Sequence, residues 1–206
     1  MGLLDQLSSM LGGQHEVERL ANGQGNFADP NSPDHDRFGQ MLGHANPEDL
    51  QASVRQAADN IDAQDYSDHI TPGVNGTNPL GMVGQGGLST IASAIMGHLI
   101  GQSGQGGGAG GILGGLLGGG GGGGGFGSLL NRIPGLRTTD PNQMDASQVA
   151  VLADYARRNN PDAFSRAASQ IGQQNPSLLQ HLLGNKFLQM AAAGLAAKFI
   201  SDRFKH

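Results

Sequence analysis

Residues 160–184, NPDAFSRAASQIGQQNPSLLQHLLG, contain the start and stop signals of two successive helices. Each predicted helix begins with Asn-Pro, where the Asn side chain can cap the first turn and Pro has a backbone φ suited to the first helical position. Apolar residues then recur at helical spacing, as Phe164, Ala167, Ala168 and Ile171 and then as Leu178, Leu179, Leu182 and Leu183. Gly184 marks the predicted end of the second helix.

Two more helices are predicted on either side of this stretch. Asp145 and Gln148 have the spacing of a capping box and predict a helix that continues through Tyr155. An Ala-rich helix is expected over residues 186–204, after Gly184. Together these short helices predict a small basic bundle within residues 132–206.

The N-terminal half has its own amphipathic segments. Asn46-Pro47 starts a predicted helix over residues 47–63, and a second helix follows from Leu88 to Ile100 with His98 on its solvent-facing side. The first apolar stripe consists of Leu3, Leu4, Leu7, Met10 and Leu11 and is ended by Gly12-Gly13. Residues 21–36 and 71–86 are rich in Pro, Asn, Asp and Gly and are expected to be loops.

Composition supports an all-α fold class. Ala, Gln, Leu and Asp are plentiful, whereas the residues that favour strands are sparse and aromatic residues make up only 4% of the chain. We therefore expect short amphipathic helices in two groups, separated by a glycine-rich central segment. The expected regions are an acidic part (1–70), a turn-rich segment with one helix (71–101), a glycine-rich linker (102–131) and the C-terminal bundle (132–206).

Charge is distributed unevenly along the 206 residues. Residues 1–70 carry twelve acidic and three basic side chains, residues 71–131 carry none, and residues 132–206 carry nine basic and five acidic ones. The acidic and basic ends can attract each other, either within one chain or between neighbouring chains. The alternative is that the uneven charge is only a variation in composition and brings no segments together.

The central tract, residues 101–127, contains eighteen glycines, including an unbroken run from Gly118 to Gly125. Because glycine loses the most conformational freedom on ordering, a flexible linker is the favoured interpretation. Ordered self-association through closely packed backbones is a second interpretation. A membrane span is a third and is disfavoured, because polyglycine is not hydrophobic and its amides would need partners in lipid.

No catalytic residue, cofactor site or metal site is predicted. The glycines lack the strand and the Lys of a phosphate loop, no GxSxG or HxxxH pattern occurs, and there is no cysteine. Asp29, Asn31, Asp34 and Asp36 lack the spacing of a calcium loop, so Asx turns are expected there. The acidic cluster at 62–69 is interpreted as the solvated end of a helix. A single basic doublet, Arg157-Arg158, argues against a nucleic-acid-binding protein.

The first residues, MGLLDQLSSMLGG, contain no basic region that would indicate a secretory signal. A cytoplasmic location is therefore expected by default, with non-classical export left open. The same stretch, the glycine-rich interior and Pro141-Asn142-Gln143 with Asp145 and Gln148-Val149 resemble the YidB-like bacterial proteins of unknown function. That resemblance covers about a third of the chain and implies a small helical protein with no assigned activity. This chain differs from that family in having no Trp and in its long uncharged middle.

These patterns predict a non-enzymatic, self-associating helical protein. The expected partner is a second copy of the chain, joined head to tail through its acidic and basic regions, in an oligomer that weakens as salt rises. A peripheral membrane protein, using the N-terminal helix or the 88–117 region, is the first alternative, and a bundle that binds a small ligand is the second. The candidate interaction residues are Leu3, Leu4, Leu7, Met10, Leu11, Leu88, Ile91, Ile95, Leu99, Phe187, Leu188, Leu195 and Phe199.

Overall fold

The computed structural model describes residues 19, 24–26, 32–71, 79–101 and 127–203, and within these it describes only the backbone of 43–44, 127–128 and 196–203. Regular structure in this part of the chain is entirely helical, which confirms the all-α class. In chain order the elements are α3 (Pro33–His44), α4 (Pro47–Asn60), α5 (Ala63–Ile70), η1 (Pro79–Met82), α6 (Gln85–Gly101), α8 (Gly127–Arg132), η2 (Pro141–Gln143), α9 (Ala146–Asn159), α10 (Pro161–Gln174) and α11 (Pro176–Arg203).

Single Asn residues form the corners between the last three helices. Asn160 ends α9, because its N–H donates to the carbonyl of Ala156, and also starts α10, because its side chain accepts from the N–H of Ala163 at 3.0 Å. Asn175 makes the same kind of corner before α11 and accepts from the N–H of Leu178 at 3.3 Å. The Asn-Pro starts predicted from the sequence are therefore confirmed at both positions.

Gly184 interrupts α11, as the sequence predicted. Its backbone angles, φ 74° and ψ 166°, are not helical, so Pro176–Arg203 consists of two helical parts that meet at this residue. A φ in this range is one that glycine adopts without steric cost. The kink places Phe187, after the bend, in the same buried cluster as Phe164 of α10, with ring centroids 6.0 Å apart.

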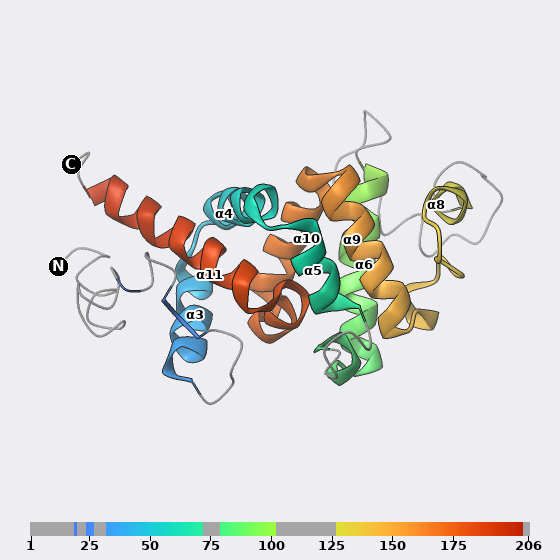
Figure 1. The fold of residues 1–206 in the computed structure, drawn as a ribbon, viewed down its shortest axis with the longest axis horizontal. Coiled ribbons are helices and arrows are strands. Elements are labelled where there is room, and N and C mark those ends of the chain that lie inside the picture. The colour runs from blue at the N-terminus through green and yellow to red at the C-terminus, as the bar shows by residue number, and fades with distance from the viewer. Residues whose placement is uncertain (1–18, 20–23, 27–31, 72–78, 102–126, 204–206) are drawn as a thin grey trace.

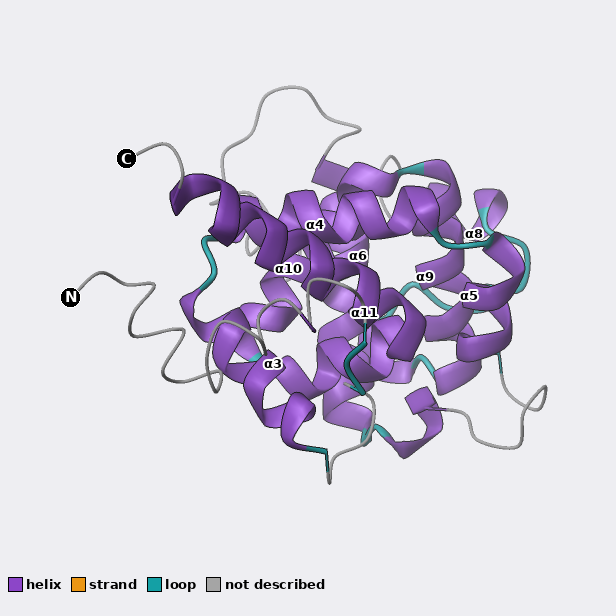
Figure 2. Ribbon diagram, turned by 60° about the vertical axis from the view of Figure 1, so that its left-hand side comes forward, coloured by secondary structure: helices purple, strands orange, loops and turns teal. Residues whose placement is uncertain are grey.

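Helix α10 occupies the middle of the molecule and packs against α4, α6, α9 and α11 (Figure 1). Its buried face is made largely of small residues, which allow neighbouring helices to approach closely. At Gly172, a Cβ would lie 2.8 Å from Leu179 of α11 and 3.3 Å from Leu50 of α4. The view turned by 60° also shows α4, α10 and α11 crossing close together (Figure 2).

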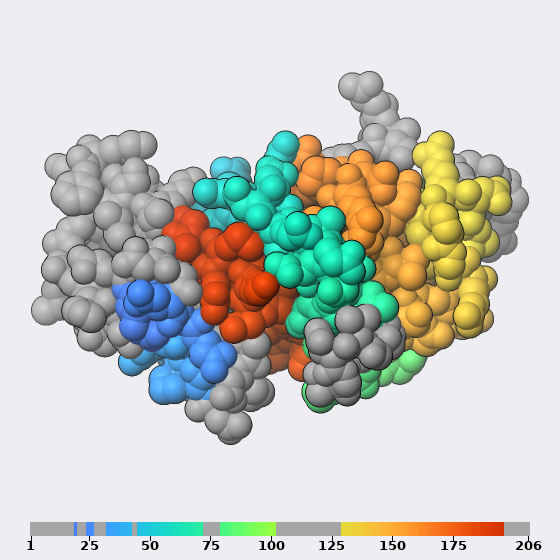
Figure 3. All heavy atoms as spheres, in the orientation of Figure 1, coloured from blue at the N-terminus to red at the C-terminus, as the bar shows by residue number. Residues whose placement is uncertain are grey.

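The two predicted helical groups share one hydrophobic core rather than forming two. Helices α4 and α6 of the first group contact α10 of the second, and the buried apolar residues of both belong to one continuous cluster. In the space-filling view, α4 and α5 lie directly against α11 and α9 (Figure 3). Most of the predicted linker, 102–126, lies outside the described residues, but its last residues belong to α8, where Leu129 is buried.

Two helices were missed in the sequence. The expected loop over 21–36 ends early, because α3 begins at Pro33 with Ser32 as its cap and Asp34 in its first turn. The predicted solvated end at 62–69 is instead the helix α5, which Asp62 caps by accepting from the N–H of Gln64 at 2.7 Å. Both starts carry ordinary capping signals. Helix α5 has only eight residues, and in α3 the buried Phe38, Met41 and Leu42 follow a polar first turn, so the apolar spacing of each helix covers only about one turn.

The start of α9 carries only part of the capping box that the sequence predicts. The Asp145 side chain accepts from the N–H of Gln148 at 2.9 Å, but the Gln148 side chain turns away and accepts from the N–H groups of Arg137 and Thr138. Only half of the predicted capping box therefore forms, and the other half anchors the segment that leads into α9. Among the described helices, none is both long and apolar enough to cross a membrane.

Candidate functional site

The predicted interaction residues that the structure describes belong to the core of the chain. All seven are at most 7% exposed: Leu88, Ile91, Ile95 and Leu99 on α6, and Phe187, Leu188 and Leu195 on α11. The apolar side of α6 packs against α9 and α10, and that of α11 packs against α4 and α10. Their apolar area is thus already removed from water within one chain. The backbone of Phe199 lies in α11 but its side chain is not described, and Leu3, Leu4, Leu7, Met10 and Leu11 lie outside the described residues.

Oppositely charged residues of the two halves pair within the chain. Arg55 of α4 pairs with Asp162 of α10, and Lys186 of α11 pairs with Asp65 of α5 at 2.9 Å. Both pairs are substantially exposed, with side-chain exposures between 41% and 70%, so each contributes little to stability. Only Lys186–Asp65 follows the acidic-to-basic layout, because Arg55 is a base of the acidic part and Asp162 an acid of the basic part.

His98 does not face solvent as predicted. Its ring lies 3.1 Å from the side-chain oxygen of Gln170 on α10 and is partly buried. Burial lowers the pKa of His98, whereas the hydrogen bond to Gln170 raises it and the charge of Arg166 lowers it further. The prediction was wrong because α10 covers a side of α6 that its sequence marks as polar.

His69 also lies between helices rather than in solvent. A Cβ on Gly184 would lie 2.5 Å from the imidazole of His69, so the ring packs flat against the bend in α11. Burial lowers the pKa of His69, a hydrogen bond to the backbone of His181 raises it, and the charge of His181 lowers it. The Nε2 atom is buried without a hydrogen-bond partner in the described part of the chain.

Asp34, in the first turn of α3, holds the preceding segment against that helix. Asp34 is only 6% exposed, forms ion pairs with Arg19 and Arg37, and accepts from the N–H of Asn26 at 2.9 Å. Two guanidinium groups thus neutralise this carboxylate and tie the preceding loop to α3. Asp29 and Asn31 lie outside the described residues, and the described ones contain no group of His, Asp or Glu arranged to hold a metal ion.

A buried polar pair joins α5 to α9 and was not predicted. The guanidinium carbon of Arg157 lies 5.1 Å from the centre of the Tyr66 ring, and Arg157 is only 7% exposed. Burial raises the pKa of Tyr66, the charge of Arg157 lowers it, and the charge of Asp154 raises it. The Tyr66 hydroxyl has no hydrogen-bond partner in the described part of the chain, so Arg157 is held by stacking on the ring and by Asp154 at 3.7 Å. Helical spacing is the signal that separates the two arginines, since Val149, Ala153 and Arg157 follow one another at four-residue intervals on the buried face of α9.

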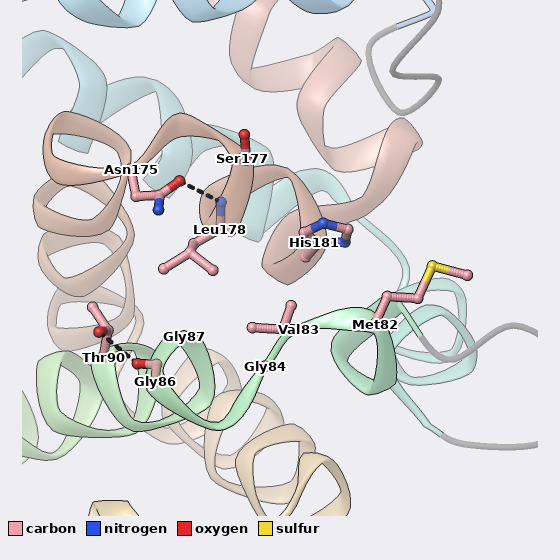
Figure 4. Close-up of a pocket in the computed structure, with 10 residues that line it drawn as sticks. All are labelled: Met82, Val83, Gly84, Gly86, Gly87, Thr90, Asn175, Ser177, Leu178 and His181. Atoms are coloured by element: carbon pink, nitrogen blue, oxygen red, sulfur yellow. Dashed lines mark hydrogen bonds between the residues drawn. The ribbon is translucent and has the colours of Figure 1, made fainter.

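An open pocket of about 420 Å³ lies between the start of α6 and the first turns of α11 (Figure 4). Val83 and Leu178 contribute apolar surface, and Met82 stands at the edge with 69% of its surface exposed. The space beside Gly84, just before α6, and Gly86, in its first turn, is open, whereas the Val83 and Leu178 side chains cover Gly87. This pocket could not be predicted from the sequence, since it arises where segments about 90 residues apart meet.

The polar groups of the pocket are mostly engaged with the backbone. The Thr90 hydroxyl donates to the carbonyl of Gly86 at 2.9 Å, and the Asn175 side chain accepts from the N–H of Leu178. Burial lowers the pKa of His181, and the charge of His35 on α3 lowers it further. A neutral imidazole among apolar surface and bare backbone is suited to binding an apolar side chain with a polar edge.

Helices α6 and α11 both begin at this pocket, and neither has an acidic residue in its first turn. In contrast, α3, α4, α5 and α10 each carry at least one acid in that position. The positive partial charge of these two helix starts is therefore not offset by an acid in the first turn, although the neutral Asn175 side chain caps the start of α11.

No protein-family model, no curated protein and no solved structure matches this chain.

Proposed function

We propose that this protein is a non-enzymatic helical interaction protein that associates with copies of itself. The adhesive element in this proposal is the N-terminal stripe, defined as Leu3, Leu4, Leu7, Met10 and Leu11. The supporting observation is that the apolar faces of α6 and α11 are buried inside the chain, while the sequence carries a further five-residue apolar stripe ahead of the described helices. Apolar stripes of this kind pack on other helices or on another subunit.

Charge has a smaller part in this proposal than the sequence alone indicated. The pairs Arg55–Asp162 and Lys186–Asp65 engage charges of the two halves within one molecule. Self-association is therefore driven mainly by apolar burial, and raising the salt concentration should weaken it only modestly.

Two variants with the same change in charge test the stripe. On a helical wheel Leu7 lies in the middle of the stripe, whereas Ser9 lies on the opposite face. Light scattering across a micromolar concentration series should show that wild type and Ser9→Glu associate alike. Leu7→Glu should raise the dissociation constant at least about tenfold, because burying one Leu side chain is worth about 1.5–3 kcal/mol. A wild-type protein that stays monomeric throughout the series would contradict the proposal, and recovery with liposomes instead would support a protein of the membrane surface.

Binding of a small ligand is a second candidate, supported by the pocket at the start of α6. Its volume of about 420 Å³ falls in the range of roughly 300–1,000 Å³ that small-molecule sites occupy. It is nevertheless open to solvent, with Met82 exposed at its edge, whereas such sites usually enclose most of their ligand. A ligand that raises the melting temperature of wild type but not of Gly86→Glu would favour this candidate over self-association.

A further inference from the structure

We propose that the pocket between η1, α6 and α11 is the docking site for the N-terminal stripe of a second copy of this chain. This inference rests on the proposed self-association and assigns the surface that receives the stripe. The four observations that support it concern the apolar surface of the pocket, its bare backbone, its charge and the point where the chain leaves α3.

The first observation is that the pocket has room for apolar side chains and that three of its lining residues are large and hydrophobic. Val83 and Leu178 line it, and Met82 is the most exposed large hydrophobic side chain among the described residues, at 69%. A flexible thioether side chain adapts to the shape of an apolar partner. Since a cavity of about 150 Å³ holds a benzene-sized molecule, a pocket of about 420 Å³ has room for two side chains the size of Leu.

The second observation is the bare backbone at the start of α6. A Cβ added at Gly84 or Gly86 would have no atom within 4 Å, so the space beside both residues is open. Close approach of a partner helix is easiest where no side chain intervenes. The two glycines thus allow the stripe to contact the first turn of α6 directly.

The third observation is complementary charge. The starts of α6 and α11 carry positive partial charge that no acid in their first turns offsets. Residues 1–18, which contain the stripe, carry Asp5, Glu16 and Glu18 and no Lys or Arg. An acidic apolar segment therefore matches this pocket better than a basic one would.

The fourth observation concerns the point at which the segment with the N-terminal stripe joins the described part of the chain. Arg19, the first described residue, pairs with Asp34 at the start of α3, and the charge of the adjacent His35 acts on His181 at the pocket. The eighteen residues before Arg19 are therefore joined to the chain next to α3, on the side of the molecule that carries the pocket. A second copy that faces this side can offer its own stripe to the pocket in return, which is the self-complementary arrangement of a two-fold dimer.

Substitutions at Gly86 test the docking in the full-length protein. Gly86→Glu places bulk and negative charge in the pocket while adding an acid and a helix former to the first turn of α6, so the fold should be retained or stabilised. Gly97→Glu is the matched control, because Gly97 also lies in α6 with no atom within 4 Å of its Cβ but does not line the pocket. Circular dichroism and melting temperature verify folding of both variants.

Sedimentation equilibrium should show a dissociation constant at least about tenfold higher for Gly86→Glu than for wild type or Gly97→Glu, since juxtaposed like charges cost several kcal/mol. Gly86→Lys, of similar bulk and opposite charge, should weaken association less than Gly86→Glu. Association of Gly86→Glu equal to that of wild type, or greater weakening by Gly86→Lys, overturns the docking site but leaves self-association standing. A wild type that is monomeric at every concentration overturns the proposed function itself.

Crosslinking gives an independent readout, since the chain has no cysteine of its own. A chain with Met10→Cys is mixed with a differently tagged chain with Met82→Cys under a mild oxidant. A mixed disulfide that exceeds the one formed with a Gly97→Cys chain supports docking between copies. Equal yields with Met82→Cys and Gly97→Cys would contradict it, and a chain carrying both Met10→Cys and Met82→Cys that crosslinks only within itself would show docking in its own pocket instead.

Discussion

Replacing Gly184 by Ala should destabilise the fold strongly, although the change adds only one methyl group. Two independent costs arise at this residue. Its φ of 74° and ψ of 166° lie in a region that is essentially restricted to glycine, which costs another residue about 1–3 kcal/mol. The new Cβ would also lie 2.5 Å from the imidazole of His69, and overpacking of this kind costs about 1–3 kcal/mol.

The free energy of unfolding of Gly184→Ala, measured by urea denaturation, should therefore fall by about 2–6 kcal/mol. A double-mutant cycle with His69→Ala separates the two causes, because removing the ring relieves the overpacking but not the backbone strain. The coupling energy should be about 1–3 kcal/mol in the direction of rescue.

Gly97→Ala is the control for the loss of glycine alone. Gly97 lies within α6 and has no atom within 4 Å of its Cβ, so Ala should stabilise the helix by about 0.5–1 kcal/mol. If Gly184→Ala behaves like this control, or if the cycle shows no coupling to His69, the account of the bend as a strained contact between α5 and α11 is wrong.

Three further predictions concern buried polar groups. Burial lowers the pKa of His69, His98 and His181, so the folded state favours the neutral form of each imidazole. The free energy of unfolding should therefore be highest above the unfolded pKa of about 6.5 and should decline as pH falls through the lower pKa values of the folded state. Urea midpoints that do not change between pH 7 and pH 5 would contradict this. Tyr66→Phe removes a buried hydroxyl that lacks a partner in the described part of the chain, and should raise the free energy of unfolding by about 1 kcal/mol; a clear loss would reveal a partner for that hydroxyl. Asp34→Asn removes a buried carboxylate paired with two arginines and should lower the free energy of unfolding by about 1–3 kcal/mol. Limited proteolysis should then cleave the chain faster before α3. An unchanged cleavage rate would show that Asp34 does not hold that segment against α3.

Helix starts could be predicted from the sequence because capping is local chemistry. At Asn160 and Asn175 the side chain that accepts the hydrogen bond and the N–H that donates it are three residues apart. The end of a helix at Gly184 is equally local, since it depends on the φ that one residue can adopt. The signals at Ser32 and Asp62 are of the same kind, but the apolar spacing behind each extends over only about one turn, residues 38–42 in α3 and 66–70 in α5.

The role of each apolar stripe could not be predicted in the same way. The stripe of α6 and that of α11 were expected to face other molecules, yet they are buried against helices that lie far away in the sequence. A stripe shows that one face of a helix will be covered, but it does not show by what. The environments of His98 and Arg157 illustrate the same point, because each side chain contacts a residue of another helix, Gln170 of α10 and Tyr66 of α5.

By itself the sequence determined the helical class, the corners at Asn-Pro and the bend at Gly184, because each depends on hydrogen bonds and backbone angles within a few residues. Only the tertiary structure decided that both halves share one core, that the apolar faces of α6 and α11 are covered within the chain, and that two helix starts meet at one pocket. These are relations between distant segments, and they depend on which surfaces exclude water most completely when the helices pack.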